Sequence, residues 1–193
     1  MKIKKPLSRQ PMPKHAKRVF QGKIFSVYQW QQKLFDGSLA TFEKIARLSS
    51  VMVLPVTDKG KIILGEQQQP IEGRFIGAIG GIVDQGEDVL EAGKRELLEE
   101  TGFSAEKWIL WDSVQLINKI DWSVYTFIVK GLKQVGSANL DAGEKIKLRF
   151  FSFNKFLSVV ADNNFRDVEI ALKVLKAKNN PKELKKMKQL FLS

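Results

Sequence analysis

The most constraining feature of this chain is a glycine-rich loop followed directly by a helix that carries three glutamates, between Gly81 and Phe103. With about 100° of rotation per residue, Glu96, Glu99 and Glu100 fall on one helical face. Carboxylates this close repel one another and weaken an isolated helix. A divalent cation such as Mg²⁺ would neutralise them, because hard cations prefer carboxylate oxygen ligands. The alternative is an amphipathic surface helix with a solvated acidic face.

The spacing of this segment resembles the complete signature of the Nudix hydrolases. The fixed positions are Gly81, then after five residues Glu87, after seven more Arg95-Glu96-Leu97, after one Glu99-Glu100, and after one Gly102-Phe103. Every position of the signature is filled, and Leu97 and Phe103 occupy its two apolar positions. This match makes the acidic surface helix the weaker interpretation.

The residues of the signature also have physical roles that follow from their types. Gly81 permits backbone angles and close approaches that a side chain would block. Glu87 lies at the expected start of the helix, where a carboxylate meets the positive end of the dipole. Arg95 has a planar guanidinium beside the carboxylates, and its N–H groups are expected to bind a glutamate side chain rather than the substrate. Gly102 is expected to end the helix.

Beyond this segment, residues 19–175 are similar to the ADP-ribose and nucleoside-diphosphate-sugar pyrophosphatase branch of that family. The similarity rests on residues 41–47 (TFEKIAR), on VMVLPV at 51–56, on a strand ending near Gln67, on an acidic loop at 141–146 and on a final-helix pattern at 167–172. The departures are Gln69 where the branch usually has Arg, Gly77-Ala78-Ile79 where it has Glu-x-Pro, and Asn118 where ADP-ribose enzymes often have proline. These departures leave open a different sugar, or broad use of nucleoside-diphosphate sugars.

The resemblance implies a set of site residues. Metal ligands would be the Gly80 carbonyl, Glu96 and Glu100, with Glu99 as a further ligand or as the base, and Mg²⁺ (or Mn²⁺) as the cofactor. Glu144 would be the general base or would complete the metal site, and the alternative is a carboxylate on a surface loop. Substrate contacts would come from Phe42, Arg47 and Gln67, with Phe42 and Arg47 reaching across a homodimer interface; the alternative for Phe42 is a core phenylalanine.

The expected fold is α/β (α+β): a Nudix-type α/β/α sandwich with a mixed sheet, extended by an N-terminal antiparallel β-hairpin. Alternation of apolar and polar residues around Asp36-Gly37 predicts a hairpin over 23–47. The expected domains are a basic N-terminal tail (1–18), the hairpin as a dimerisation and substrate-recognition element (19–48), the catalytic domain (49–176) and a Lys-rich C-terminal tail (177–193). The expected helices lie at about 87–101, at NKFLSVVADN, at FRDVEIALKVLKA and in the tail.

Composition narrows the protein class further. The 193 residues include no cysteine, which excludes disulfides, cysteine nucleophiles and thiolate zinc sites. Nothing approaches the ~20 apolar residues of a membrane span, and a cytoplasmic protein without a membrane partner is expected. The net charge of +11 is concentrated at the two ends, where no stacking aromatics accompany the lysines, so a nucleic-acid partner is not expected.

These observations together predict Mg²⁺-dependent hydrolysis of the diphosphate bond in a small-molecule substrate, ADP-ribose or a related nucleoside-diphosphate sugar. The products would be a nucleoside monophosphate and a sugar phosphate. Two alternatives remain: a pyrophosphohydrolase of nucleoside triphosphates, oxidised nucleotides or RNA 5′ ends, and a nucleotide-binding module without catalysis.

Overall fold

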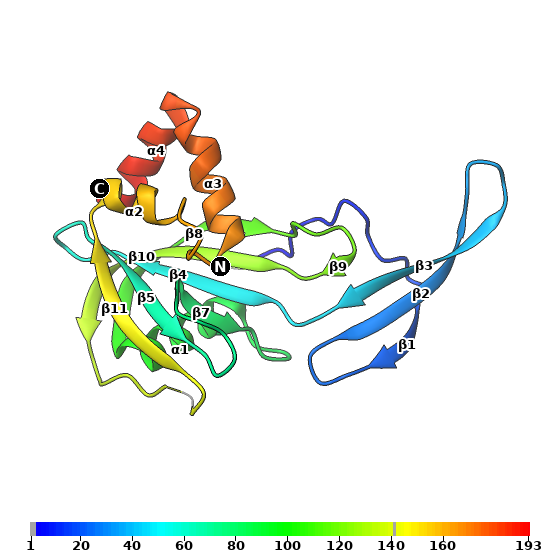
Figure 1. Cartoon of the computed structure of the whole chain (residues 1–193), viewed down its shortest axis with the longest axis horizontal. Helices are drawn as coiled ribbons and strands as arrows, with labels where there is room; N and C mark the ends of the chain where they lie inside the picture. Colours follow the sequence, from blue (N-terminus) through cyan, green and yellow to red (C-terminus); the bar gives the residue numbers. More distant parts are fainter. Residues whose placement is uncertain (1–2, 141) are drawn as a thin grey trace.

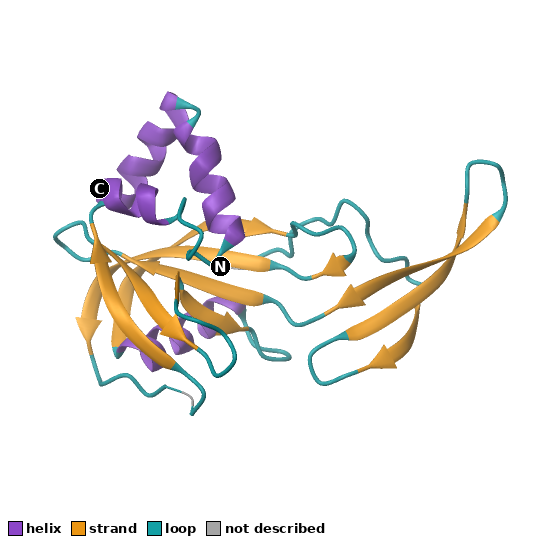
Figure 2. Ribbon diagram, viewed as in Figure 1, coloured by secondary structure: helices purple, strands orange, loops and turns teal. Residues whose placement is uncertain are grey.

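The protein has a body of sheets and helices from which an N-terminal sheet projects (Figure 1). The computed structural model describes residues 3–140 and 142–193. Asp141, part of the acidic loop noted in the sequence, lies outside these ranges. Figure 2 shows that helices cover the body on two sides, whereas the projecting part contains strands and loops.

The projecting sheet is built on the predicted hairpin. Strands β2 (Ser26–Lys33) and β3 (Leu39–Ala46) pair antiparallel, and the Ser38 N–H donates a hydrogen bond to Asp36 Oδ1 across the turn at 3.0 Å. Two further strands extend the sheet to the order β1-β2-β3-β9, namely β1 (Lys17–Gln21) and β9 (Ile120–Asp121). The hairpin prediction is therefore confirmed, and β9 joins this sheet to the body.

The body contains a mixed sheet, as the sequence predicted. Its order is β7-β4-β10-β8, formed by β7 (Ile79–Ile82), β4 (Ser50–Pro55), β10 (Val124–Gln134) and β8 (Phe103–Val114). Strands β4 and β10 run parallel and the other pairs are antiparallel. A second sheet, β11-β5-β6, comprises β11 (Lys145–Phe151), β5 (Ile62–Gln68) and β6 (Phe75–Gly77).

Strand β4 is apolar on both faces because helices cover both sides of its sheet. Side chains alternate between the two faces of a strand. Val51 and Val53 pack with Leu97 of helix α1 (Val89–Thr101) in one core cluster. Leu54 packs on the opposite side, in the cluster that contains helices α2 (Phe153–Val159), α3 (Val168–Lys178) and α4 (Pro181–Leu192). The result is the expected α/β/α layering (Figure 1).

Both lysine-rich ends of the chain pack against the rest of the protein. Helix α4, in the segment expected as a C-terminal tail, buries Phe191 to 1% exposure, and its ring centroid lies 5.5 Å from that of Phe156. Near the other end, the buried Lys44 ammonium donates hydrogen bonds to Ser8 Oγ (2.9 Å) and to the Gln10 carbonyl (2.6 Å). Among the described residues, no helix has the length and hydropathy required to span a membrane.

Candidate active site

Helix α1 presents the glutamates because both its ends are fixed by local hydrogen bonds. Asp88 is the N-cap residue and accepts the Leu90 N–H at 2.8 Å. Gly102 ends the helix in the left-handed region, with φ 72°, and its N–H donates to the Leu98 carbonyl. The helix thus begins after Glu87, which precedes the cap and accepts the Asp84 N–H at 2.9 Å.

Arg95 connects a carboxylate that precedes α1 with two carboxylates in the second half of this helix. Its guanidinium donates to both oxygens of Glu87 (3.0 and 3.1 Å), to Glu96 Oε1 (2.8 Å) and to Glu99 Oε2 (3.1 Å). It also donates to the Ile82 carbonyl at 2.9 Å, which ties the helix to the loop before it. The Arg95 guanidinium lowers the pKa of Glu87. Arg95 therefore orients this carboxylate group and is itself fully engaged.

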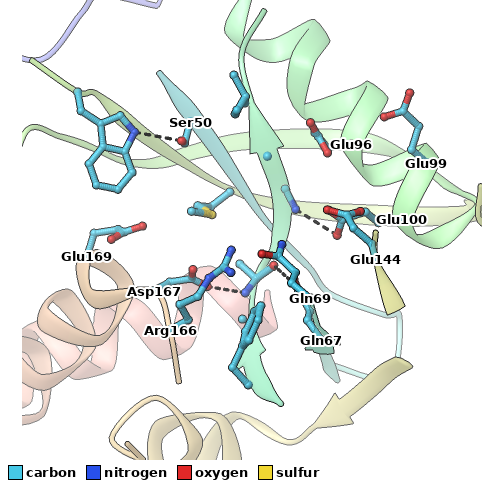
Figure 3. Close-up of a pocket in the computed structure, with 18 of the residues that line it drawn as sticks. Ser50, Gln67, Gln69, Glu96, Glu99, Glu100, Glu144, Arg166, Asp167 and Glu169 are labelled. Carbon is cyan, nitrogen blue, oxygen red and sulfur yellow. Dashed lines mark hydrogen bonds between the residues drawn. The ribbon is translucent and has the colours of Figure 1, made fainter. Parts of the chain in front are cut away.

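Glu100 is the most buried of the helix glutamates, with 6% of its surface exposed. Its Oε2 accepts the Gly80 N–H at 3.3 Å, as Figure 3 shows. The pKa of Glu100 is raised to about 9, mainly by burial and in smaller part by the negative charges of Glu96 and Glu144. Burial also raises the pKa of Glu96, against the opposing effect of Arg95. The carboxyl groups of Glu96 and Glu100 are thus crowded together in a poorly solvated space.

Two glycines bring strand β7 against its neighbours. Gly80 has φ 143°, and a Cβ at this position would overlap the Val51 carbonyl oxygen. A Cβ at Gly81 would lie 2.5 Å from Glu96 Oε1. A side chain at Gly80 is therefore excluded by the backbone, whereas one at Gly81 would require the Glu96 carboxylate to move.

A pocket of about 1010 Å³ opens beside these residues. Of the residues predicted for the site, those that line it are Gly80, Gly81, Gln67, Arg47, Arg95, Glu96, Glu99, Glu100 and Glu144. Glu144 comes from the segment before β11 and lies beside Glu100 in Figure 3. Glu87 and Gly102 lie outside the lining, at the two ends of α1.

Phe42 is the predicted substrate-binding residue that does not line this pocket. It lies on β3, where its ring centroid is 6.1 Å from that of Trp30 and the Lys119 ammonium lies 5.0 Å above the ring. Within a single chain the structure therefore does not bring Phe42 to the glutamates. A contact with substrate from this position requires a second copy of the chain.

Arg47 lies at the end of the pocket near the projecting sheet. Its guanidinium lies 4.9 Å from the Trp122 ring centroid and 5.8 Å from that of Phe25. Its buried Nε has no hydrogen-bond partner among the described residues, and burial lowers the pKa of the guanidinium. The Trp122 indole N–H donates to Ser50 Oγ at 3.0 Å, which fixes the ring at the pocket wall.

Two acidic residues at the start of α3, Asp167 and Glu169, also line the pocket, although the sequence did not predict them as site residues. Asp167 Oδ2 accepts the Ala78 N–H at 2.6 Å, and Gln67 Nε2 donates to the Ala78 carbonyl at 3.1 Å. The backbone just before Gly80 is thus held from both sides. Burial raises the pKa of Asp167 to about 7. The motif Asp-Val-Glu was visible in the sequence, but its nearness to the glycine loop depends on the path of the chain.

The donor set fits a hard divalent cation. Within residues 3–140 and 142–193, no three side chains of the metal-binding types already converge as a cage. The pocket nevertheless presents several carboxylates, and burial together with like charges raises the pKa of Glu96 and Glu100. A bound cation would relieve that crowding, and carboxylate oxygens are the ligands that Mg²⁺ and Mn²⁺ prefer.

Comparison with known proteins is consistent with this geometry. A NUDIX domain model matches residues 46–174. A methanol dehydrogenase activator of Bacillus methanolicus is 25% identical over 82% of this chain and 88% of its own length. An ADP-ribose pyrophosphatase of Bacillus subtilis (strain 168) is 35% identical over 47% of this chain and 49% of its own. The ADP compounds hydrolase NudE of Escherichia coli (strain K12) is 30% identical over 50% and 53%.

A solved structure also resembles the whole fold. The crystal structure of an ADP compounds hydrolase superposes with a TM-score of 0.69 and covers 91% of this chain and 95% of that one, at 21% sequence identity. At this identity, the likeness establishes the shared fold. The matches to the two hydrolases from Bacillus subtilis and Escherichia coli span about half the length of those relatives.

Proposed function

The chain belongs to the Nudix hydrolase family, and we propose that it hydrolyses the diphosphate bond of a nucleoside diphosphate linked to a sugar. The products are a nucleoside monophosphate and a sugar phosphate. The observation that carries the proposal is the gathering of Glu96, Glu99, Glu100 and Glu144 in one large pocket that also contains Arg47. The names of the hydrolases from Bacillus subtilis and Escherichia coli, which refer to ADP-ribose and ADP compounds, support a nucleoside diphosphate derivative as substrate.

The glutamates have separate tasks in this proposal. Glu96, Glu100 and the Gly80 carbonyl hold Mg²⁺, or Mn²⁺ in its place. A bound metal would supply positive charge to offset the diphosphate and would lower the pKa of a water molecule placed for in-line attack. Arg95 keeps Glu96 and Glu99 oriented through its hydrogen bonds, so their positions are set before substrate arrives.

Two carboxylates are candidates to accept the proton of the attacking water. Glu99 is 44% exposed and bonded to Arg95, whereas Glu144 approaches from a different element, beside Glu100. A positioned general base contributes roughly 10²- to 10⁴-fold. Kinetics of Glu99→Gln and Glu144→Gln distinguish the two candidates. The variant that lacks the base is expected to have a lower kcat and to lose the acidic limb of the pH–rate profile.

A homodimer is part of the same proposal. The projecting sheet exposes large apolar side chains, among them Phe20 (58%), Ile24 (55%) and Leu39 (67%). A second copy that covers them would bring the partner's Phe42 towards this pocket and hide the exposed apolar area. Sedimentation at micromolar concentration is expected to show a particle of twice 21.9 kDa, and a monomer at that concentration would contradict the dimer.

The activity is tested with ADP-ribose, ADP-glucose, GDP-mannose, UDP-glucose, NADH and nucleoside triphosphates, with and without Mg²⁺. Metal-dependent release of a nucleoside monophosphate is expected. Release of pyrophosphate would instead indicate a triphosphate substrate, and inactivity on all substrates would indicate a binding module.

The Glu100→Gln variant tests the site itself. It is expected to lower kcat at least ~100-fold while the protein stays folded, since the lost metal ligand is also a lost catalytic charge. Glu183→Gln is the matched control, because Glu183 is 53% exposed on α4, pairs with Lys186 at 2.9 Å and does not line the pocket. Near-normal turnover of Glu100→Gln would refute the assigned role.

A further inference from the structure

Glu169 is a buried carboxylate in the pocket that the proposed reaction does not use. It lies in the first turn of α3 and is 7% exposed. Figure 3 shows it on the wall formed by α3, whereas Glu96 and Glu99 come from α1 on the other side. Its Oε1 is buried and has no hydrogen-bond partner among the described residues.

Two basic side chains that lie close to Glu169 in the sequence are engaged elsewhere. Lys173, one turn further along α3, pairs with Asp112 at 2.9 Å and lies over the Trp111 ring. Arg166 pairs with Glu72 at 3.2 Å and stacks on Phe75, with its guanidinium 4.1 Å from the ring centroid. Burial raises the pKa of Glu169 and the charge of Asp112 adds to the rise, whereas its own backbone N–H and the charge of Arg166 oppose it.

A buried carboxylate oxygen without a partner costs free energy, so its presence in the pocket needs a compensating role. Asp167, two residues earlier, shows the contrast, because its Oδ2 holds the Ala78 N–H and so serves the fold. Glu169 has no comparable contact for Oε1. Buried carboxylate oxygens without a protein donor are common in binding sites, where a ligand supplies the donor.

The charge of Glu169 limits what it can contact. The proposal places no metal at Glu169, and a carboxylate without a metal repels the negatively charged diphosphate, so Glu169 faces a neutral part of the substrate. The same pocket presents Met52 and the Trp122 ring, which suit the flat or apolar surfaces of a nucleoside. The complementary chemistry is a neutral hydrogen-bond donor, which a nucleotide offers as a sugar hydroxyl or as an exocyclic amino group.

We propose that Glu169 is a specificity-determining residue that accepts a hydrogen bond from a neutral donor group of the nucleotide substrate. This inference rests on the proposed function for the kind of ligand. It concerns binding and not the chemical step.

The test is equilibrium binding of AMP, inosine monophosphate and ribose 5-phosphate to the full chain by calorimetry, which requires no turnover. Glu169→Leu is expected to weaken AMP binding about ten- to a hundredfold, as for a lost hydrogen bond to a charged group, and Glu169→Gln less. A loss confined to AMP identifies the amino group, because inosine monophosphate lacks it. A loss shared by AMP and inosine monophosphate identifies a sugar hydroxyl.

Two controls separate recognition from a structural role. Glu183→Gln is expected to bind all three probes as the wild type does. Glu169→Gln and Glu169→Leu are expected to unfold at the wild-type temperature or above, since they remove an unpaired buried charge. Unchanged affinities in both variants, a wild type that binds none of the probes, or a marked loss of thermal stability would each overturn the inference. Failure of the proposed hydrolysis would appear separately, as inactivity of a wild type that still binds AMP.

Discussion

A methyl group added at Gly81 tests whether the position of Glu96 governs catalysis. In Gly81→Ala the new Cβ would lie 2.5 Å from Glu96 Oε1, whereas ordinary van der Waals contact begins at 3.4 Å. The oxygen must therefore withdraw by about 0.9 Å, the difference between these two distances. A displacement near 1 Å in a catalytic constellation costs on the order of 10²-fold in rate. We expect kcat to fall by about that factor.

The same substitution is expected to leave the fold almost unchanged. The atoms that Cβ would meet belong to the Glu96 side chain, which can move, and Gly81 has no positive φ. The free energy of unfolding should therefore change by less than ~1 kcal/mol. In Gly80→Ala, by contrast, Cβ would overlap the Val51 carbonyl oxygen at φ 143°, and a loss of more than ~3 kcal/mol is expected.

The assay combines steady-state kinetics on the preferred substrate with urea unfolding of the same preparations. Gly73→Ala is the control, because a Cβ there has nothing within 4 Å and the φ of Gly73 is not positive. It should match the wild type in both measurements. Near-normal kcat in Gly81→Ala, or a stability loss equal to that of Gly80→Ala, would refute the link between this close approach and catalysis.

Three further predictions concern the stability of the fold and the packing of its two ends. The pKa of Asp167 is raised from 3.8 to about 7, so the stability that Asp167 contributes is fully present below pH 3.8 and is lost as pH rises through about 7. In urea unfolding across this range, Asp167→Asn should make the free energy of unfolding less dependent on pH. An unchanged pH dependence of that free energy would contradict the prediction. Phe191→Ala should cost about 3–5 kcal/mol in denaturant unfolding, and a loss below ~1 kcal/mol would exclude α4 from the core. In Lys44→Met, residues 3–16 should be cleaved faster in limited proteolysis, because the bonds to Ser8 and Gln10 are lost; equal cleavage would show that Lys44 does not hold this segment.

Features that depend on nearby residues could be predicted well from the sequence. The turn at Asp36-Gly37 and the helix that ends at Gly102 follow from preferences of these residues for particular backbone angles. The glutamates of α1 share a face because the helical repeat places them there. The apolar character of 51–56 is visible in the sequence, but the burial of β4 on both faces depends on the helices that cover the two sides of its sheet.

Other features were not predictable because they join distant parts of the chain. Arg47, which was expected to reach across a dimer interface, lines the pocket of its own chain. The lysine-rich segment at the C-terminus buries Phe191, although its charge suggested a tail. In such a helix the few apolar residues decide the packing, and the lysines remain at the surface.

The sequence by itself determined the chemistry available at the site: a run of glutamates at helical spacing, glycines where side chains would collide, and an arginine that can hold several carboxylates. Tertiary structure alone decided which residues meet these groups. Ala78 is bonded to Asp167, 89 positions further along the chain, and Glu169 enters the same pocket. Local hydrogen bonds and steric limits are encoded within a few residues, whereas such meetings depend on how the sheets and helices bury their apolar surfaces together.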